Sequence, residues 1–284
     1  MVKLRFPRKD EGVAVLVNLD ECIGCRACQI ACQEWNGRKA LRTSFSPTFT
    51  NPRDLHAEAW KVVFFNEFPV TKTLKVAEVE TSISSVDVIP VPYNCLHCTE
   101  APCGRACPVG AIKVSDEGAV VIEPGECIGC GFCQDACPYN VPRRGPDGMF
   151  YKCSFCVDRI QAGLEPACVE VCPTNVFKFT SMAEAVNIAK NMEAQGKKVY
   201  GLNVDSYTGG RLRWIFTASQ EKAGRVFPAM FPESAKTPNS FRETVESLAI
   251  PAAGIISAII LGLLSFTWLR FKRKGTAESG GACR

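Results

Sequence analysis

Short apolar runs alternate with turn-forming stretches over most of the chain, and several of these runs border groups of cysteines. VAVLVNL (13–19), AIKV (111–114), AVVIE (119–123) and VFKF (176–179) have the length and the β-branched content of short strands. The pattern therefore predicts small strands around cysteine-bearing loops.

An insertion without cysteines interrupts this pattern at residues 38–90. Within it, AWKVVFFNEF (59–68) and TLKVAEVE (73–80) are rich in β-branched and aromatic residues. We expect both runs to form strands of an inserted section.

A helix and a strand are predicted after the last cysteine group. SMAEAVNIAKNMEAQG has helical spacing, Ser181 and Glu184 form a capping-box pattern, and Gly196 is a stop signal. RLRWIFTAS (211–219) is a predicted strand. The proline-containing stretch 224–240 is predicted to be a linker that lies against a partner or the membrane surface.

The segment LAIPAAGIISAIILGLLSFTWL (248–269) has no charge over 22 residues. As a helix it would be about 33 Å long, which suffices for a hydrocarbon core of about 30 Å. Pro251 falls in the first turn, where its missing N–H does no harm, and Trp268 lies near the end, where interfacial aromatics collect. The sequence predicts a transmembrane helix here; a buried core helix is the alternative.

Charge near this segment predicts its orientation. Four basic residues come just after it: Arg270, Lys272, Arg273 and Lys274. Residues 233–247, before it, contain two basic residues, Lys236 and Arg242. The positive-inside rule therefore places the tail 270–284 in the cytoplasm and the remainder on the outer, periplasmic face. No secretion signal is visible in MVKLRFPRKDEG, so we expect export together with a partner that carries one.

Sixteen of the 17 cysteines fall into four groups of four. The groups are Cys22, Cys25, Cys28 and Cys32; Cys95, Cys98, Cys103 and Cys107; Cys127, Cys130, Cys133 and Cys137; and Cys153, Cys156, Cys168 and Cys172. Cysteines at i and i+3 on a tight loop converge on a metal more readily than on a distant thiol. Cys283 belongs to no group and is expected to be a spare thiol.

The spacing indicates iron–sulfur clusters. The third group, followed by Pro138, matches the bacterial ferredoxin run C-x2-C-x2-C-x3-C-P in full, and the first differs only in having Gln33 after it. The second and fourth are longer variants that end in Pro108 and Pro173. In such runs three thiolates hold one cubane and the fourth cysteine ligates another, so four [4Fe–4S] clusters are predicted.

ECIGCRACQIAC (21–32) and ECIGCGFCQDAC (126–137) agree at nine of twelve positions, which indicates an internal repeat. The predicted fold class is α+β, with two ferredoxin-like domains related by a pseudo-twofold duplication and one C-terminal transmembrane helix. The expected divisions are 1–37 with 150–180 and 91–149 as the two cluster domains, 38–90 as the insertion, 181–247 as an extension with linker, 248–269 as the membrane helix and 270–284 as the tail.

Other residues near the cysteines have supporting roles in this prediction. Gly24, Gly129 and Gly131 are candidate cofactor-binding residues, because glycine lets backbone N–H groups point toward cluster sulfides. His97 is expected to lie beside the ligands or on the surface without ligating. Structural zinc is the alternative metal, but triplets at every third residue fit its usual paired ligands poorly.

The net charge and the motifs of the chain argue against nucleic-acid binding and catalysis. The net charge of +4 would become about −4 with four clusters bound, so basicity indicates no nucleic-acid partner. The sequence contains no phosphate-binding glycine motif and no catalytic triad. We therefore expect no catalytic site in this chain and a role in electron transfer.

These motifs resemble the four-cluster ferredoxin-type subunits of molybdopterin- or tungstopterin-dependent oxidoreductases, over about residues 10–180. Within that group the chain most resembles the iron–sulfur (beta) subunit of membrane-bound respiratory formate dehydrogenase. The resemblance is carried by CIGCRACQIACQEWN, NPRDLHAEAWKV, FYKCSFCVDRIQAGLEPACVEVCPT and the single C-terminal membrane segment. Sister subunits serve polysulfide, thiosulfate, sulfoxide and hydrogen enzymes.

The resemblance implies a crossed ligand pattern. The sets would be Cys22, Cys25, Cys28 and Cys172; Cys32, Cys153, Cys156 and Cys168; Cys95, Cys98, Cys103 and Cys137; and Cys107, Cys127, Cys130 and Cys133. It also implies a pterin-bearing catalytic partner that oxidises formate and a membrane cytochrome b, or another quinone-reactive subunit, in the lipid bilayer. A sister enzyme as partner, or a zinc-stabilised membrane scaffold without redox role, are the rival interpretations.

Overall fold

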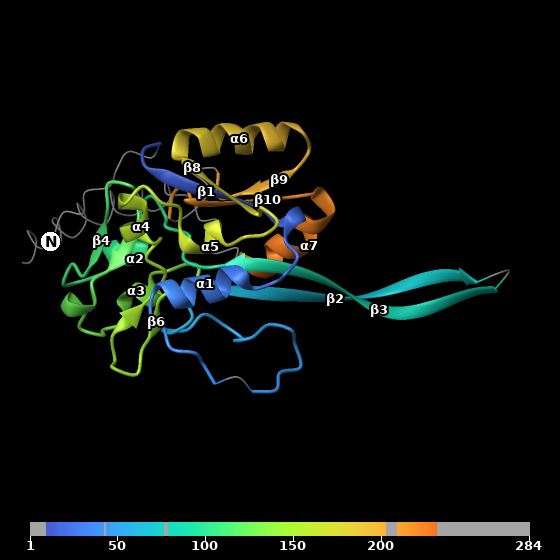
Figure 1. Ribbon diagram of the computed structural model, residues 1–284, viewed down its shortest axis with the longest axis horizontal. Helices are drawn as coiled ribbons and strands as arrows, with labels where there is room; N and C mark the ends of the chain where they lie inside the picture. Colours follow the sequence, from blue (N-terminus) through green and yellow to red (C-terminus); the bar gives the residue numbers. More distant parts are fainter. Residues whose placement is uncertain (1–9, 43, 77–78, 203–208, 232–284) are drawn as a thin grey trace, which may run out of the picture. The chain divides into compact units, whose positions relative to one another are not determined.

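A four-stranded sheet joins segments from both ends of the described chain (Figure 1). Its order is β8 (Phe177–Ser181), β1 (Val13–Asn18), β10 (Trp214–Ala218) and β9 (Lys198–Tyr200). β1 pairs antiparallel with β8 and parallel with β10, and β10 pairs antiparallel with β9. The sheet therefore holds the N-terminal strand between two strands that follow the last cysteine group.

The computed structural model describes residues 10–42, 44–76, 79–202 and 209–231. Contacts divide the chain into a unit of residues 1–237 and a second of residues 238–284, and all described residues belong to the first. The predicted membrane segment 248–269, the tail 270–284 and Cys283 lie outside the described residues. Within the described ranges, no helix is both long and apolar enough to cross a bilayer.

The two faces of the sheet pack against different partners, because side chains alternate along each strand. One face carries Ala14, Leu16 and Ile215 against helix α6 (Met182–Ala194). The other face carries Val15, Val17, Trp214 and Phe216 into the core shared with the cysteine-bearing segments. The cysteine-bearing segments thus pack against one face of the sheet.

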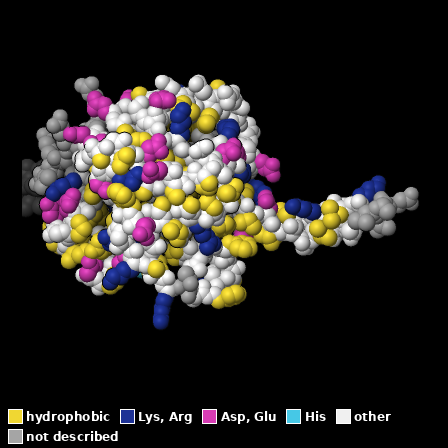
Figure 2. Space-filling view, in the orientation of Figure 1, with side chains coloured by type: hydrophobic (Ala, Val, Ile, Leu, Met, Phe, Trp, Pro, Cys, Tyr) yellow, Lys and Arg dark blue, Asp and Glu magenta, His cyan; other side chains and the backbone are white. Residues whose placement is uncertain are grey.

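A hairpin of two 15-residue strands, β2 (Val62–Val76) and β3 (Val79–Tyr93), extends from this core. Its base is buried, whereas Leu74, Ile83 and Val86 on its distal part are exposed. Figure 2 shows apolar and basic side chains along this distal part.

The structure corrects the strand prediction within the insertion. The run 73–80 is not one strand, because its first residues end β2 and its last begin β3. β-Branched residues occur on both sides of the reversal, and the intervening Ala77 and Glu78 carry none of the Asn, Asp or Gly signals of a two-residue turn. The sequence pattern therefore could not place the reversal.

The cysteine-bearing part consists of short elements between loops (Figure 1). They are the 3-10 turns η1 (Leu19–Glu21) and η2 (Pro124–Glu126), the helices α1 (Ala27–Trp35), α2 (Pro102–Arg105), α3 (Phe132–Asp135), α4 (Val157–Gln161) and α5 (Ala167–Glu170), and the strand pairs β4 (Ile112–Val114) with β5 (Val120–Ile122) and β6 (Arg143–Arg144) with β7 (Phe150–Tyr151).

The repeat in sequence is also a repeat in local structure. A 3-10 turn precedes Cys22 and Cys127, and a left-handed residue, Arg26 or Gly131, begins the following helix. Mixed α+β ferredoxin-type architecture, as predicted, follows from these elements.

The elements after the last cysteine group agree with the prediction in part. Helix α6 begins after Ser181, whose Oγ accepts from the Glu184 N–H at 3.3 Å, but the Glu184 carboxylate accepts from Thr180. Only half of the capping box forms. The linker predicted from residue 224 is wrong for its first part, because helix α7 covers Gln220–Met230 and tolerates Pro228 in its last turn.

Candidate iron–sulfur centres

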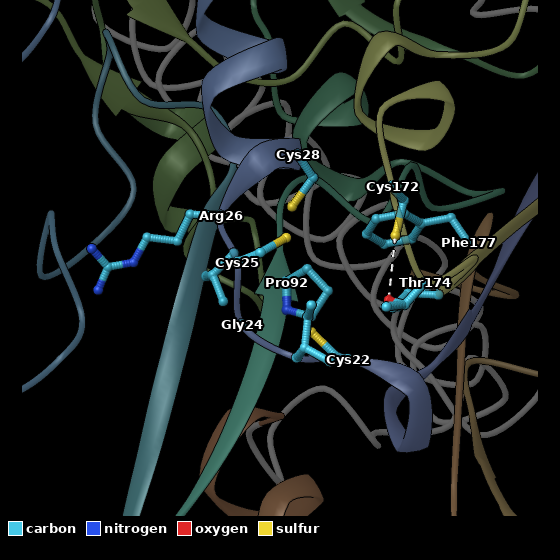
Figure 3. A pocket seen from close by; sticks show the side chains of 12 residues that line it. Cys22, Gly24, Cys25, Arg26, Cys28, Pro92, Cys172, Thr174 and Phe177 are labelled. Carbon is cyan, nitrogen blue, oxygen red and sulfur yellow. Dashed lines mark hydrogen bonds between the residues drawn. The ribbon is translucent and has the colours of Figure 1, made fainter.

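Cys22, Cys25, Cys28 and Cys172 surround one cavity, although Cys172 is far from the others in sequence (Figure 3). The sulfurs of Cys25, Cys28 and Cys172 point into the same space, and Thr174 lies beside Cys172. We call these four cysteines set I.

The local conformation around Gly24 explains how three of these thiols converge. Gly24 has a φ of 70°, and a Cβ there would meet the Phe65 ring at 2.8 Å. The Gly24 N–H bonds to the Cys22 sulfur and lowers a thiol pKa that burial raises first. Arg26 then begins α1 in a left-handed conformation, so the helix presents Cys28 toward the cavity.

α1 also carries Cys32, one turn beyond Cys28, which places both on nearby parts of one helix face. Cys32 belongs to a different group of thiols. Burial raises the pKa of Cys32 well above its ordinary value, and the neighbouring thiols Cys153, Cys168 and Cys156 raise it further. Cys32, Cys153, Cys156 and Cys168, all buried, form set II.

Set III consists of Cys95, Cys98, Cys103 and Cys137, which line a second cavity together with Lys152 and Tyr139. Burial raises the pKa of Cys137 to about 11. The backbone approaches closely here, since a Cβ on Gly209 would lie 2.6 Å from the Cys98 sulfur.

Set IV consists of Cys107, Cys127, Cys130 and Cys133 around a further cavity. Burial raises the pKa of Cys133 to about 11. Gly129 and Gly131 both have positive φ, and a Cβ on Gly129 would lie only 2.5 Å from the Gly148 carbonyl oxygen. The loop therefore requires glycine at 129 for both conformation and space.

Each set combines thiols from two sequence groups, and the crossed ligand pattern that the resemblance implies stays a prediction. The last cysteine of each sequence group joins a different set, with Cys172 in set I, Cys32 in set II, Cys137 in set III and Cys107 in set IV. In the described part of the chain, no three Cys, His, Asp or Glu side chains are arranged to hold a single metal ion. A cubane is ligated at four separate irons, so its thiolates surround a volume, as the thiols of these sets do.

Comparison with known proteins agrees with this geometry. The family model of the 4Fe-4S dicluster domain matches residues 86–182, and that of a 4Fe-4S binding domain matches residues 19–35. The thiosulfate reductase electron transfer subunit of Salmonella typhi is 34% identical over 166 residues, which are 58% of this chain and 73% of that protein. The formate dehydrogenase iron–sulfur subunit of Haemophilus influenzae is 38% identical over 205 residues, 70% of this chain and 62% of that protein. The chain belongs to this family of iron–sulfur subunits.

A second formate dehydrogenase relative, the iron–sulfur subunit of formate dehydrogenase-O from Escherichia coli, is 38% identical over 189 residues, 66% of this chain and 59% of that protein. The chain thus spans about three fifths of the length of its formate dehydrogenase relatives. As a member of the family, it binds [4Fe–4S] clusters through its cysteine motifs.

Sets I and IV, which we call the outer sets, are more exposed to solvent than sets II and III. Cys25 of set I and Cys130 of set IV are exposed. Beside them, the repeated Cys-Ile-Gly-Cys loops expose Ile23 by 65% and Ile128 by 61%. The same motif therefore makes two similar apolar surfaces, one at each outer set.

His97 is not a surface residue, as one of the two predicted alternatives had it. It is fully buried, stacks on Phe155 at 4.7 Å, and its Nδ1 accepts from the Val120 N–H at 3.0 Å. Burial, with Lys152 and Arg213 nearby, lowers the pKa of His97 well below its ordinary value, so the ring is neutral. His56 has a local role, because its Nδ1 accepts from the Glu58 N–H.

Two buried lysines near the cysteines were not predicted from the sequence. Lys61 is 1% exposed and Lys152 is 5% exposed, and both lie near thiols of two sets. The one signal in the sequence was their context, since each is flanked by apolar or aromatic residues in AWKVV and FYKCS.

We expect Gly129→Ala to lose the metal of set IV. The new methyl group would displace the Gly148 carbonyl and, with it, the loop between Cys127 and Cys130. Iron per purified chain should fall by about four atoms, the content of one cubane. Gly163→Ala is the matched control, because Gly163 has a similar φ of 77° but nothing within 4 Å of the added Cβ. Equal iron in both variants would contradict the expectation.

Proposed function

We propose that this chain carries single electrons through four [4Fe–4S] clusters in a membrane-bound formate dehydrogenase. The electrons would come from a molybdopterin or tungstopterin subunit that oxidises formate, and pass to a cytochrome b or another quinone-reactive membrane subunit. Each cluster would supply one-electron redox chemistry, and each of the sets I to IV would supply the four thiolates of one cluster. The observation that carries the proposal is that sixteen cysteines form four sets, each next to another.

The neighbour relations of the sets support a linear path. Burial raises the pKa of Cys28 in set I to about 12, Lys61 lowers it, and Cys168 of set II is the thiol that raises it most. Burial raises the pKa of Cys153 in set II, and Cys156 of the same set and Cys95 of set III raise it further. Contacts between α2 and α3 then bring set III next to set IV. The order is I, II, III, IV, with the exposed Cys25 and Cys130 at the two ends.

The thiol pKa values support cluster binding as well. Buried thiols at high pKa stay protonated unless a positive centre is bound, and a metal cluster binds thiolates with release of protons. The chain supplies the surroundings for this exchange: backbone N–H donors, such as Gly24 to Cys22 and Phe155 to Cys153 at 3.3 Å, reach the ligand sulfurs.

Formate is favoured as the substrate of the catalytic partner because the formate dehydrogenase relatives exceed the sulfur-enzyme relatives in identity and in covered length of this chain. The second candidate is the same electron-transfer role in another oxidoreductase. It is supported by the thiosulfate reductase relative and by a sulfite dehydrogenase relative from Allochromatium vinosum, which is 32% identical over 177 residues, 59% of this chain and 68% of that protein.

Purification of the full-length chain with its native partners tests the choice. The complex should oxidise formate with a quinone analogue as acceptor, and should neither reduce thiosulfate nor oxidise sulfite. Thiosulfate or sulfite activity without formate activity would favour the second candidate. The lack of a visible absorption that dithionite bleaches would favour the zinc-stabilised scaffold, because Zn²⁺ sites are colourless and redox-inactive.

We propose that residues 1–240 lie on the outer face of the membrane, with the basic tail 270–284 in the cytoplasm. The support is the excess of Lys and Arg after the apolar segment 248–269. Protease added to intact spheroplasts should digest the cluster-bearing part and spare the tail. Protection of residues 1–240 together with cleavage of the tail would reverse the orientation.

A further inference from the structure

Lys61 occupies a site built for a positive charge. Its Nζ donates to the Asn94 Oδ1 at 2.7 Å and lies 4.5 Å and 4.2 Å from the centroids of the Phe177 and Trp214 rings. The Asn94 amide is fixed in this orientation because its Nδ2 donates to the Cys95 carbonyl oxygen at 2.7 Å. An amide oxygen and two ring faces all attract a cation, and an ammonium group has the three donors that they can accept.

Thiols of two sets lie around Lys61. Cys168, Cys28, Cys153 and Cys32 lie close enough to act electrostatically on Lys61, and the Phe177 ring that the Lys61 Nζ contacts also lines the cavity of set I. Cys28 belongs to set I, and the other three belong to set II. Lys61 therefore lies at the junction between set I and set II.

Lys152 occupies the equivalent place at the next junction. Its Nζ donates to the carbonyl oxygens of Val120 and of Cys153, the latter at 3.1 Å. Its side chain lines the cavity of set III together with Cys95, Cys103 and Cys137, and one of the carbonyl groups that it contacts belongs to Cys153 of set II. Lys152 therefore lies between sets II and III.

The other two buried cations of the described chain differ from these lysines. Arg159, close to Cys156, is paired with the Glu170 carboxylate, which offsets its charge. Arg213 donates to the carbonyl oxygens of Glu11 and Val13, where the inner strands β1 and β10 begin. The charges that act most strongly on Cys133 of set IV are those of Cys127, Cys130 and Cys107.

We propose that Lys61 and Lys152 are fixed positive charges that raise the reduction potentials of the clusters on either side of them. Lys61 would act on clusters I and II, and Lys152 on clusters II and III. The proposal rests on the assignment of one cluster to each set. Cluster IV receives no such contribution from either lysine.

The charge balance gives the direction. A [4Fe–4S]2+ core with four thiolates has a net charge of −2, and one electron from the preceding carrier makes it −3, with no bond broken and no proton taken up. A nearby ammonium stabilises −3 more than −2, so it favours the reduced state. With an effective dielectric constant of about 20, a unit charge several ångströms away changes such an equilibrium tenfold or more.

Potentiometric titration followed by EPR, on the full-length chain in its native complex, tests the proposal with Lys61→Met. Two of the four cluster reductions should become about tenfold less favourable or more, a fall of about 59 mV for one electron. The other two should stay in place. Lys152→Met should also shift two reductions, one of which is shared with Lys61→Met.

The controls separate charge from side-chain loss. Lys61→Arg keeps the charge and should keep all four potentials near those of the wild type. Lys178→Met removes an exposed lysine next to Phe177 and should shift none. Four unchanged potentials in Lys61→Met, with about sixteen iron atoms retained, would overturn the proposal.

Three other outcomes are also decisive. If the wild-type chain lacks four reducible clusters, the cluster assignment fails before any variant is compared. If Lys61→Met fails to load its clusters, Lys152→Met tests the same rule at the next junction. Loss of clusters in both methionine variants, with full loading of Lys61→Arg and Lys152→Arg, would assign the lysines to assembly and overturn their effect on potential.

Discussion

About sixteen iron and sixteen acid-labile sulfide per chain are expected in protein prepared without oxygen, at four of each per cluster. The expectation follows from four sets of four cysteines, none of which lacks a member. Because these thiols are largely buried, with raised pKa values at Cys28, Cys32 and Cys133 among others, the protein without metal would hold neutral thiols in its core.

Elemental analysis and sulfide release measure this content directly. Stoichiometric zinc with little iron would contradict the account and favour the scaffold interpretation. About twelve iron atoms would instead indicate that one set holds no cubane, at four irons per cubane, and cysteine substitutions in each set would show which one.

Cys168 and Cys172 are expected to serve different clusters although they are four residues apart. Cys168 lies in α5 among the thiols of set II, and Cys172 follows the same helix and lines the cavity of set I. Cys172→Ser should therefore disturb the cluster held by Cys22, Cys25 and Cys28, and leave the one held by Cys153 and Cys156.

Pairs of substitutions make this distinction quantitative. Cys22→Ser with Cys172→Ser removes two ligands of one cluster, so iron should fall to about twelve atoms per chain. Cys168→Ser with Cys172→Ser removes one ligand from each of two clusters, so iron should fall to about eight. The reverse result, eight for the first pair and twelve for the second, would show that each sequence group holds its own cluster.

The cysteine sets were the part of the site most accessible from sequence, because ligand spacing is a local property. The ferredoxin run fixes which three thiols share a loop, and the left-handed Arg26 and Gly131 after each loop reproduce the repeat in structure. Which distant cysteine completes each set depends on packing between α1 and α5 or between α2 and α3. That information came from the family resemblance and not from the spacing.

Long-range strand pairing was less accessible. The strand at 214–218 was predicted as an element, but its parallel pairing with β1, about 200 residues earlier, has no local signal. The reversal between β2 and β3 was misplaced because the chain has no turn residues there. Helix α7 was missed because Pro228 and Gly224 argue against a helix, whereas Ala223 and Val226 bury one face of it.

Lys61 and Lys152 show the limit of reading residue types alone. A lysine in an apolar run is usually exposed on the polar face of a strand, so the sequence favours a solvated side chain. Only the tertiary structure shows that Asn94 and two aromatic rings surround Lys61, and that Lys152 donates to two backbone carbonyl groups.

The central claim is that electrons from formate pass through the clusters of this chain. Rapid-freeze EPR of the oxidised native complex, mixed with formate in the absence of oxygen, tests it most directly. The account predicts that the [4Fe–4S] signals of this chain appear in the reduced form, and that they are diminished in a complex carrying Cys153→Ser. Clusters that stay oxidised with formate, although dithionite reduces them, would contradict it.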